Sequence, residues 1–331
     1  MAATIKDIAK FTGLGYATIS AYLNGVKVRD YNRVKIENAI AELGYIRNEY
    51  ARGLKTHRSM TIGILLPEIA DTFFTAIVKQ MQDIFRKNGY GIIVSDSKTN
   101  EEMEKQSLQF LVSKMVDGMI VIPVSRDGQI FNSVIDRNIP MVLIDRLTSN
   151  NRVPHIVINN REISRKAIES LIEKGHMNIA LISGIPNIYT AEERKAGYID
   201  AVMSIDNYKE EYIFRGDFTL EGGYHAMKQI IADYQEITAV FVTNYDMSLG
   251  AIIAINEQGK NIPNDYSFIA FDNMELSKIF NPQLITINQP LKQIGQKAAE
   301  LLISQINKQE VEKLIVYDGE IIKGNSIKNL V

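Results

Sequence analysis

From residue 60 onward, short apolar runs alternate with stretches long enough to form a helix, and this alternation constrains the fold more than any other feature. The apolar runs are continuous, which indicates strands buried on both faces, as in a parallel sheet flanked by helices. We therefore expect an α/β body. Its strands are expected at 61–66, 91–95, 118–122, 141–144, 179–182, 239–243 and 267–271, and its helices at 74–88, 164–174, 191–204, 222–233, 246–258 and 291–307.

Polar and aromatic residues recur just after the ends of these expected strands. Ligands of open parallel sheets bind at the carboxyl ends of the strands, so these positions are candidates for a binding site. Carboxylates and amides bind hydroxyl groups and aromatic rings stack on a sugar ring, so the set favours a sugar ligand. The candidate positions are 71–74, Asp145, Arg146, Asn159, Asn160, Arg194, Phe218, Asn244, Asp272 and Asn273.

The first sixty residues have the pattern of a small helical domain. Thr4 and Asp7 have the spacing of a capping box, which predicts a helix that begins near residue 5. Gly13 would end this helix in a tight turn before a second helix. The small Ala9 and the apolar Ile19 would allow the two helices to cross closely. This arrangement predicts a helix-turn-helix.

A third helix at 30–43 and the charge distribution complete this region. Residues 1–60 contain ten Lys and Arg and five Asp and Glu, whereas the rest of the chain contains 27 and 34. A basic segment on an acidic body is typical of a polyanion-binding domain joined to another domain, although uneven surface charge is an alternative. The third helix carries the apolar residues Val34, Ile36, Ile40 and Leu43 and would end at Gly44.

DNA is the expected partner of this domain. In a helix-turn-helix protein the second helix enters the major groove, and its N-terminal side chains contact the base edges. Other side chains contact phosphates, which fix the register without reading the sequence. We assign base contacts to Tyr16, Ala17, Thr18, Ser20 and Ala21, and phosphate contacts to Asn24, Arg33 and Lys35, with Thr4 at the start of the first helix in the same DNA-binding set.

Four segments of this region resemble the LacI/GalR (lactose-repressor) family of transcriptional regulators. They are 4–9, 17–20, 23–25 and 42–45, and Asn48, Ala51 and Leu54 extend the match. The resemblance implies a hinge helix at about 48–55 that forms on DNA, with Leu54 wedged into the minor groove of a palindromic operator. Ala21 and Arg47 depart from the family pattern, which has arginine and proline there. The resemblance therefore leaves open which bases are read.

The body is similar to the two-lobed type I periplasmic-binding-protein fold of the same family. This resemblance implies a helix-turn-helix domain with its hinge at 1–58 and an effector-binding and dimerisation domain at 59–331. The first lobe would comprise about 60–158 and 290–331, and the second about 159–289. Asp71-Thr72 and Tyr245 depart from the family pattern at the edge of the pocket. The effector-binding residues it implies are Phe73, Phe74, Asp145, Arg146, Arg194, Phe218, Asn244, Asp272 and Gln289.

The expected function is that of a sequence-specific DNA-binding transcription regulator. It would be a cytoplasmic homodimer that represses a carbohydrate-utilisation operon and is switched by a monosaccharide bound between the lobes. Two alternatives keep the regulator but replace the sugar with a purine or nucleoside, or with a phosphoprotein partner. A third is a sugar-binding transport protein, which would not explain residues 1–58.

Enzymatic activity is not expected from this sequence. The chain contains no cysteine, and its four histidines show no metal-ligand spacing. No nucleophile-elbow or phosphate-loop motif is present. We therefore expect no cofactor and no metal. The sequence shows neither an apolar signal-peptide core nor an apolar run long enough to span a membrane, so we expect no membrane association.

Overall fold

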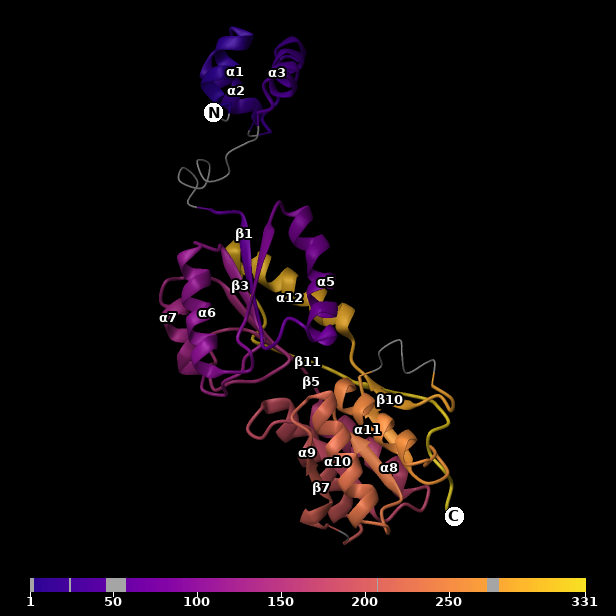
Figure 1. Cartoon of the computed structure of the whole chain (residues 1–331). Helices are drawn as coiled ribbons and strands as arrows, with labels where there is room; N and C mark the ends of the chain where they lie inside the picture. The colour runs from indigo at the N-terminus through magenta and orange to yellow at the C-terminus, as the bar shows by residue number, and fades with distance from the viewer. Residues whose placement is uncertain (1–2, 24, 46–57, 207, 273–279) are drawn as a thin grey trace. The chain divides into compact units, whose positions relative to one another are not determined.

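A computed structural model describes residues 3–23, 25–45, 58–206, 208–272 and 280–331 of the chain. The chain forms two compact units, Met1–Ser59 and Met60–Val331 (Figure 1). Each unit has its own buried core and is described by itself.

The first unit contains three helices, α1 (Ile5–Thr12), α2 (Tyr16–Leu23) and α3 (Asp30–Leu43). Its core is formed by Ile8, Ile19, Ile36 and Ala39, whose side chains are fully buried. Burial of these apolar side chains is the main force that holds three short helices together. Val34, another apolar residue of α3, is 46% exposed and lies outside this core.

Local interactions fix both ends of α1. The side chain of Thr4 accepts from the backbone at the start of the helix, and Asp7 accepts a hydrogen bond from the Thr4 backbone N–H at 2.8 Å. This reciprocal pair is the capping box predicted from the sequence. Gly13 ends the helix with a φ of +70°, a left-handed conformation that glycine adopts without strain. The sharp reversal brings α2 against α1.

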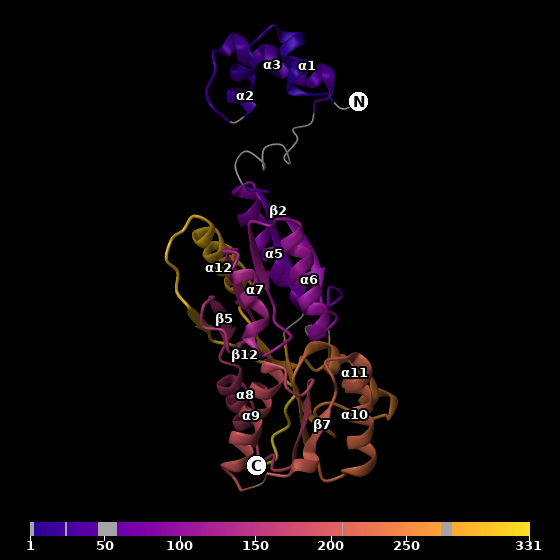
Figure 2. The same ribbon diagram turned by 90° about the vertical axis from the view of Figure 1, so that its left-hand side faces the viewer.

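The second unit contains two six-stranded sheets, each of which forms the centre of a lobe (Figures 1 and 2). The first sheet is parallel throughout, and the second is parallel except for one antiparallel edge strand, β12. The first has the order β11 (Leu314–Tyr317), β5 (His155–Ile158), β4 (Met141–Ile144), β3 (Gly118–Val121), β1 (Thr61–Leu66) and β2 (Gly91–Asp96). The second has the order β12 (Glu320–Ile322), β10 (Ile285–Asn288), β9 (Ser267–Phe271), β8 (Ala239–Val242), β6 (Ile179–Ser183) and β7 (Ile213–Arg215).

Helices cover both faces of each sheet. In the first lobe α5 packs beside α12, and α6 packs on β1 and β2. In the second lobe α8 packs beside α9, and α10 packs beside α11. Their bounds are α5 (Thr72–Lys87), α6 (Glu101–Ser113), α7 (Asn132–Ile135), α12 (Leu291–Ile306), α8 (Asn160–Ile172), α9 (Tyr189–Met203), α10 (Leu220–Asp233) and α11 (Tyr245–Glu257), with short 3-10 turns at Gly128–Phe131 and Glu210–Tyr212.

The chain passes between the lobes three times: from β5 to α8, from β10 to α12, and from β11 to β12. Asn159 joins two of these crossovers. Its Nδ2 donates to Asp318 Oδ1 at 2.7 Å, and its Oδ1 accepts from the Gly319 backbone N–H at 2.9 Å. Because β12 belongs to the second sheet, the assignment of all of 290–331 to the first lobe is wrong for the segment that follows β11.

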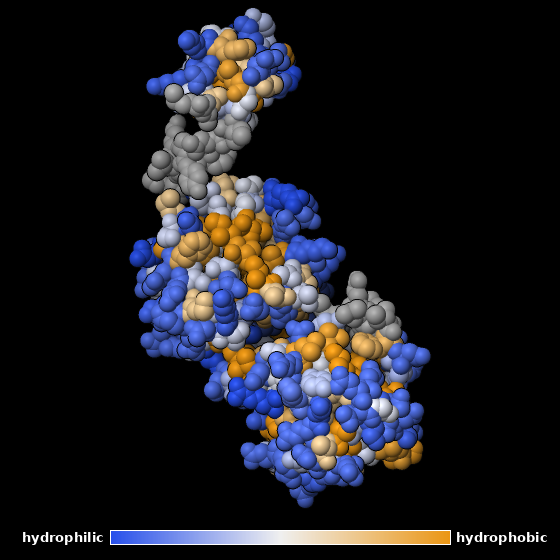
Figure 3. All heavy atoms as spheres, viewed as in Figure 1, coloured by the Kyte–Doolittle hydropathy of each residue, from blue (hydrophilic) through white to orange (hydrophobic). Residues whose placement is uncertain are grey.

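One surface of the first lobe is apolar. Figure 3 shows apolar residues gathered in the region of β1 and α5, and further apolar areas over the second lobe. On the edge strand β2, the apolar side chain of Val94 is 37% exposed. Contiguous apolar surface of this kind is typical of a protein contact.

Candidate functional sites

The N-terminal end of α2, which the sequence predicts to contact DNA bases, is exposed. Tyr16 is 56% exposed, and Ala17 beside it is also exposed. Thr18, Ser20 and Ala21 are half-buried along the same helix. Ile19 lies on the opposite side and is fully buried in the core of the unit. The buried isoleucine fixes the rotation of α2, so the predicted base-contacting residues lie at its accessible surface.

The residues predicted to contact phosphates make interactions within their own unit. Arg33 Nη1 donates to Glu37 Oε1 at 3.0 Å, and the Tyr22 hydroxyl donates to the same oxygen at 3.0 Å. Lys35 places its Nζ 4.7 Å from the ring centroid of Tyr31. The exposed Thr4 caps α1, as described above. Arg33 is exposed and Lys35 is half-buried, and contact of either side chain with a phosphate remains a prediction.

Four predicted DNA-binding residues lie outside the described part of the chain. They are Asn24, Asn48, Ala51 and Leu54, and the predicted hinge helix at about 48–55 lies there too.

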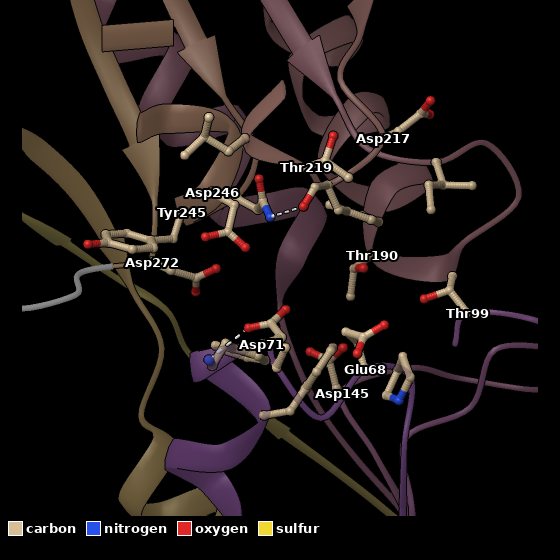
Figure 4. Close-up of a pocket in the computed structure, with 18 of the residues that line it drawn as sticks. Glu68, Asp71, Thr99, Asp145, Thr190, Asp217, Thr219, Tyr245, Asp246 and Asp272 are labelled. Carbon is tan, nitrogen blue, oxygen red and sulfur yellow. Dashed lines mark hydrogen bonds between the residues drawn. The ribbon is translucent and has the colours of Figure 1, made fainter. Parts of the chain in front are cut away.

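A cavity of about 580 Å³ lies in the second unit, and residues from both lobes line it. Figure 4 shows side chains from the two lobes that point into it. Eight of the nine predicted effector-binding residues are among its lining residues, namely Phe73, Phe74, Asp145, Arg146, Arg194, Phe218, Asn244 and Asp272. The ninth, Gln289, lies behind this lining and donates from Nε2 to Asp272 Oδ1 at 2.6 Å.

Two of these carboxylates directly follow strands and have the same unusual backbone conformation. Asp145 follows β4 with a φ of +67°, and Asp272 follows β9 with a φ of +71°. Each backbone N–H donates to a neighbouring strand at 2.8 Å, to Ile156 and Ile287 respectively. Aspartate tolerates the left-handed region better than most residues, although it costs free energy. Such positions cluster at functional sites, and here they turn both carboxylates toward the cavity.

Arg194 is buried and held by two hydrogen bonds. Its Nε donates to Asn160 Oδ1 at 2.9 Å, and its Nη1 donates to the Thr243 carbonyl at 2.6 Å. The guanidinium also lies 3.5 Å from the ring centroid of Phe271. Burial lowers the pKa of Arg194, while the neighbouring Asp272 and Asp145 oppose that change. The guanidinium is therefore fixed in orientation before any ligand arrives.

Arg146 has a similar environment in the first lobe. Its Nη1 donates to the Pro123 carbonyl at 2.9 Å, and its Nε lies 3.4 Å from Asp145 Oδ2. The loop that carries this carbonyl is held by Glu104, a fully buried carboxylate. Glu104 accepts from the backbone N–H groups of Val124 at 2.8 Å and Ser125 at 3.1 Å. Glu104, which lies on α6, thus positions the loop that orients Arg146.

Aromatic rings form the apolar part of the cavity. The rings of Phe73 and Phe74 are edge-on to each other, with centroids 5.4 Å apart. Phe218 lies against Gly184, where a Cβ atom would be 2.1 Å from the phenylalanine ring. Only glycine at this position lets the ring lie where it does. Asn244 supports the same loop, because its Nδ2 donates to the Phe218 carbonyl at 3.3 Å.

The acidic residues of the cavity influence one another. Burial, together with the carboxylates of Asp246, Asp272 and Asp145, raises the pKa of Asp71 to about 7. Burial also raises the pKa of Asp272 to about 6, although Arg194 and Gln289 favour its charged form. Crowded carboxylates in a poorly hydrated cavity disfavour one another's ionisation.

Sequence reasoning missed several lining residues. Asp246 and Thr190 lie in the first turns of α11 and α9. The direction of such a side chain depends on its position around the helix, which the strand-end rule does not predict. Glu68 follows β1 and could have been found by the strand-end rule. Asp71 and Tyr245, which the sequence places at the edge of the pocket, also line it, and the other lining residues outside the predicted effector set are Pro67, Ala70, Thr99, Ile185, Asp217, Thr219 and Leu220.

The site has the chemistry of a binding site for a hydroxyl-bearing molecule. It offers carboxylates, guanidinium groups and an amide for hydrogen bonds, together with aromatic faces. Within the described residues, no group of three or more His, Asp or Glu side chains is arranged to hold a metal ion. Among the described helices, none is long and apolar enough to cross a membrane.

Two family profiles match the chain. Residues 4–48 match the bacterial regulatory proteins of the lacI family, and residues 59–317 match the periplasmic binding proteins and sugar-binding domain of the LacI family. Catabolite control protein A of Priestia megaterium is 33% identical, over 96% of each chain.

Two solved structures are also similar over nearly the full length of the chain. The lac repressor dimer bound to operator and the anti-inducer ONPF has a TM-score of 0.88 and 27% identity, over 98% of this chain and 99% of that one. The complex of the transcriptional regulator CelR with cellobiose has a TM-score of 0.74 and 25% identity, over 98% and 99%.

Proposed function

Because the chain belongs to the LacI family of bacterial DNA-binding transcription regulators, which carry an effector-binding domain, we propose that a small sugar bound in the cavity controls its affinity for an operator. The observation that carries this proposal is the convergence of eight strand-end and helix residues from two lobes on one cavity. Catalysis has no part in the proposed function.

The composition of the cavity supports a sugar as the effector. Carboxylates such as Asp145 and Asp272 accept hydrogen bonds from ring hydroxyls, and Arg194 donates to ring or hydroxyl oxygens. The rings of Phe73, Phe74 and Phe218 pack on the apolar face of a pyranose or furanose. The volume of about 580 Å³ is in the range of pockets for small ligands. The matching family profile describes a sugar-binding domain, and the similar CelR structure contains cellobiose.

A ligand in this cavity would bind both lobes at once. The first lobe contributes Phe73, Phe74 and Asp145, and the second contributes Arg194 and Asp272. Simultaneous contact with both lobes favours the closed arrangement over the open one. Such differential binding is what an effector needs to shift a conformational equilibrium and to couple to DNA binding.

In the proposed mechanism a homodimer binds a palindromic operator. The α2 helix of each protomer enters the major groove, with Tyr16 and Ala17 closest to the base edges. The apolar area around β1 and α5, with the edge strand β2, is the surface that we assign to dimer formation. Closure of the lobes would change this contact, and thereby the spacing of the two DNA-binding units.

Calorimetric titration with a panel of pentoses, hexoses, cellobiose, purines and nucleosides tests the effector class. We expect one sugar to bind and to change operator affinity in a gel-shift assay. Arg194→Ala should abolish that binding. Arg161→Ala is the matched control, because Arg161 is an exposed arginine that pairs with Asp200 outside the cavity lining. Binding of a nucleobase or nucleoside in place of every sugar would overturn the sugar assignment.

A further inference from the structure

The cavity contains many more acidic than basic groups. Its lining includes six carboxylates, Glu68, Asp71, Asp145, Asp217, Asp246 and Asp272, and two guanidinium groups, Arg146 and Arg194. Both guanidinium groups already donate to backbone carbonyls, Arg146 to Pro123 and Arg194 to Thr243. The only described ion contact that Arg146 makes within the lining is with Asp145. The acidic groups therefore outnumber the cations available to them.

Three of the carboxylates come from different elements and meet in one part of the cavity. Asp71 lies at the N-terminus of α5 in the first lobe, whereas Asp246 and Asp272 lie at α11 and after β9 in the second. Figure 4 shows Asp246 and Asp272 on one side of the cavity and Asp71 facing them from the other. Burial is the main cause of the raised pKa values of Asp71 and Asp272, about 7 and about 6, and neighbouring carboxylates, among them Asp246 and Asp145, add to both. Like charges so arranged oppose closure of the lobes unless something neutralises them.

A fourth carboxylate, that of Asp145, has Arg146 as its one charged partner in the described part of the chain. Its side chain is 93% buried. Among the described residues, no backbone N–H donates to its side chain, and its one ion contact is the 3.4 Å approach of Arg146 Nε. Buried carboxylates ordinarily accept two or more hydrogen bonds. This group lines the cavity, so hydroxyl groups of a ligand can donate to it.

We propose that the effector is a sugar that carries a protonated amine, and that the amine binds between Asp71, Asp246 and Asp272 while hydroxyl groups of the same molecule donate to Asp145. This inference rests on the proposed function, because it assigns a charge to the sugar of that site. A primary ammonium has three donors and one positive charge, which matches three convergent carboxylates. A phosphorylated sugar would bring negative charge into an already acidic cavity.

Binding of an amino sugar should change the number of protons bound to the carboxylates of the cavity. Asp71 titrates near neutral pH in the free protein, and an ammonium beside it would lower its pKa. The amine itself would stay protonated between carboxylates. Binding at pH 7 would therefore release protons, whereas a neutral sugar that buries these carboxylates would release none or take protons up.

Matched pairs of sugars test the amine directly. Calorimetric titrations would compare D-glucosamine with D-glucose, D-galactosamine with D-galactose and D-mannosamine with D-mannose, and would include the N-acetyl forms and glucose 6-phosphate. We expect at least one amino sugar to bind about tenfold or more tightly than both its hydroxyl and N-acetyl partners. Repeating the titration in buffers of different ionisation heat should show proton release at pH 7.

Two isosteric variants locate the amine. Asp246→Asn should reduce the preference for the amino sugar about tenfold, because one of the three carboxylates is lost. Asp217→Asn is the control: this carboxylate also lines the cavity but is 44% exposed and pairs with Arg215, so the preference should stay. Because the readout is a ratio of two affinities for one variant, a general loss of folding does not imitate it.

Two outcomes overturn the inference in different ways. If the amine-free sugars bound more tightly, an amine-bearing effector would be excluded and the proposed regulation by a sugar would stand. If no amino sugar bound and a nucleoside or nucleobase did, both the amine-bearing effector and the proposed sugar regulation would be excluded. Equal effects of Asp246→Asn and Asp217→Asn on the preference would place the amine elsewhere and overturn the assigned site.

Discussion

Gln289 Nε2 donates to Asp272 Oδ1 across 2.6 Å, and this bond joins the second crossover between the lobes to a carboxylate of the cavity. Gln289 is 96% buried, and it directly follows β10 where the chain leaves the second sheet. The bond therefore ties a carboxylate of the cavity to one of the three segments that connect the lobes.

Removing this bond should weaken effector binding more than it weakens the fold. In Gln289→Ala, Asp272 loses the donor that favours its charged form, so its pKa should rise above about 6. We expect effector affinity at pH 7 to fall about tenfold, since a hydrogen bond to a charged group is worth about 1.5–3 kcal/mol. Titration calorimetry and an NMR titration of Asp272 measure the two effects. An unchanged affinity would show that the crossover does not support the site.

Acidic groups of the cavity should make the second unit less stable as pH rises. The pKa values of Asp71 and Asp272, about 7 and about 6, lie above those of an unfolded aspartate. The folded state therefore binds more protons than the unfolded state between about pH 4 and 7, and stability falls through that range. Asp246, Asp272, Asp145 and Arg146 are the charged groups that act on Asp71.

Urea denaturation of the ligand-free protein at pH 5, 6, 7 and 8 measures this slope. Asp71→Asn should flatten it, because the amide cannot ionise. Asparagine still caps α5, where the carboxylate accepts from the Phe73 backbone N–H at 2.8 Å. Asp136→Asn, at an exposed residue paired with Arg152, is the control. An identical slope in the wild-type and Asp71→Asn proteins would contradict the prediction.

The strand-end rule explains why most of the cavity could be predicted. Asp145 and Asp272 directly follow buried apolar strands, and parallel strands place their carboxyl ends at the same edge of a sheet. Asp246 was missed because it belongs to a helix, where a shift of one residue along the chain turns the side chain by about 100° around the helix axis. Gln289 was predicted as a ligand contact, yet the structure places it behind Asp272.

The exchange of strands between lobes could not be predicted from local pattern. β12 is only three residues long and pairs antiparallel with β10, which lies about 30 residues earlier in the chain. β11 exposes Leu314 and Val316 at the sheet edge, so it lacks the continuous burial that marks the central strands. Helix α6 begins with three glutamates in its first turn, and most of its apolar residues lie in its second half. These elements are defined by their tertiary neighbours.

The contact between Phe218 and Gly184 should be sensitive to a single methyl group. In Gly184→Ala the new Cβ would lie 2.1 Å from the phenylalanine ring, so the ring must leave its place in the cavity. We expect effector affinity to fall about tenfold or more, similar to Phe218→Ala, because the apolar wall is lost in both. Gly15→Ala, where nothing lies within 4 Å, is the control for the substitution itself. Wild-type affinity in Gly184→Ala would contradict this account.

Glu104 should stabilise the loop that orients Arg146. Glu104→Gln keeps the shape of the side chain but turns an NH2 group toward one of two backbone N–H donors. A buried donor left without an acceptor costs about 1–3 kcal/mol, which we expect as the loss in the free energy of unfolding. Urea denaturation measures it. The exposed Glu102→Gln on the same helix should change stability by less than about 0.5 kcal/mol.

Tyr16 offers the sharpest test of the DNA-binding surface. It is 56% exposed at the N-terminus of α2, and its removal should leave the core around Ile19 intact. In Tyr16→Ala we expect operator affinity to fall about tenfold or more while effector affinity is unchanged. Phe11→Ala is the matched control, because Phe11 on α1 is an aromatic residue that is also 56% exposed and is not predicted to contact DNA. An operator is first selected from random DNA with the full-length protein. Fluorescence anisotropy on this operator then measures the DNA affinity of the two variants, and titration calorimetry measures their effector affinity. If the two variants lost affinity equally, α2 would not be the helix that reads the sequence.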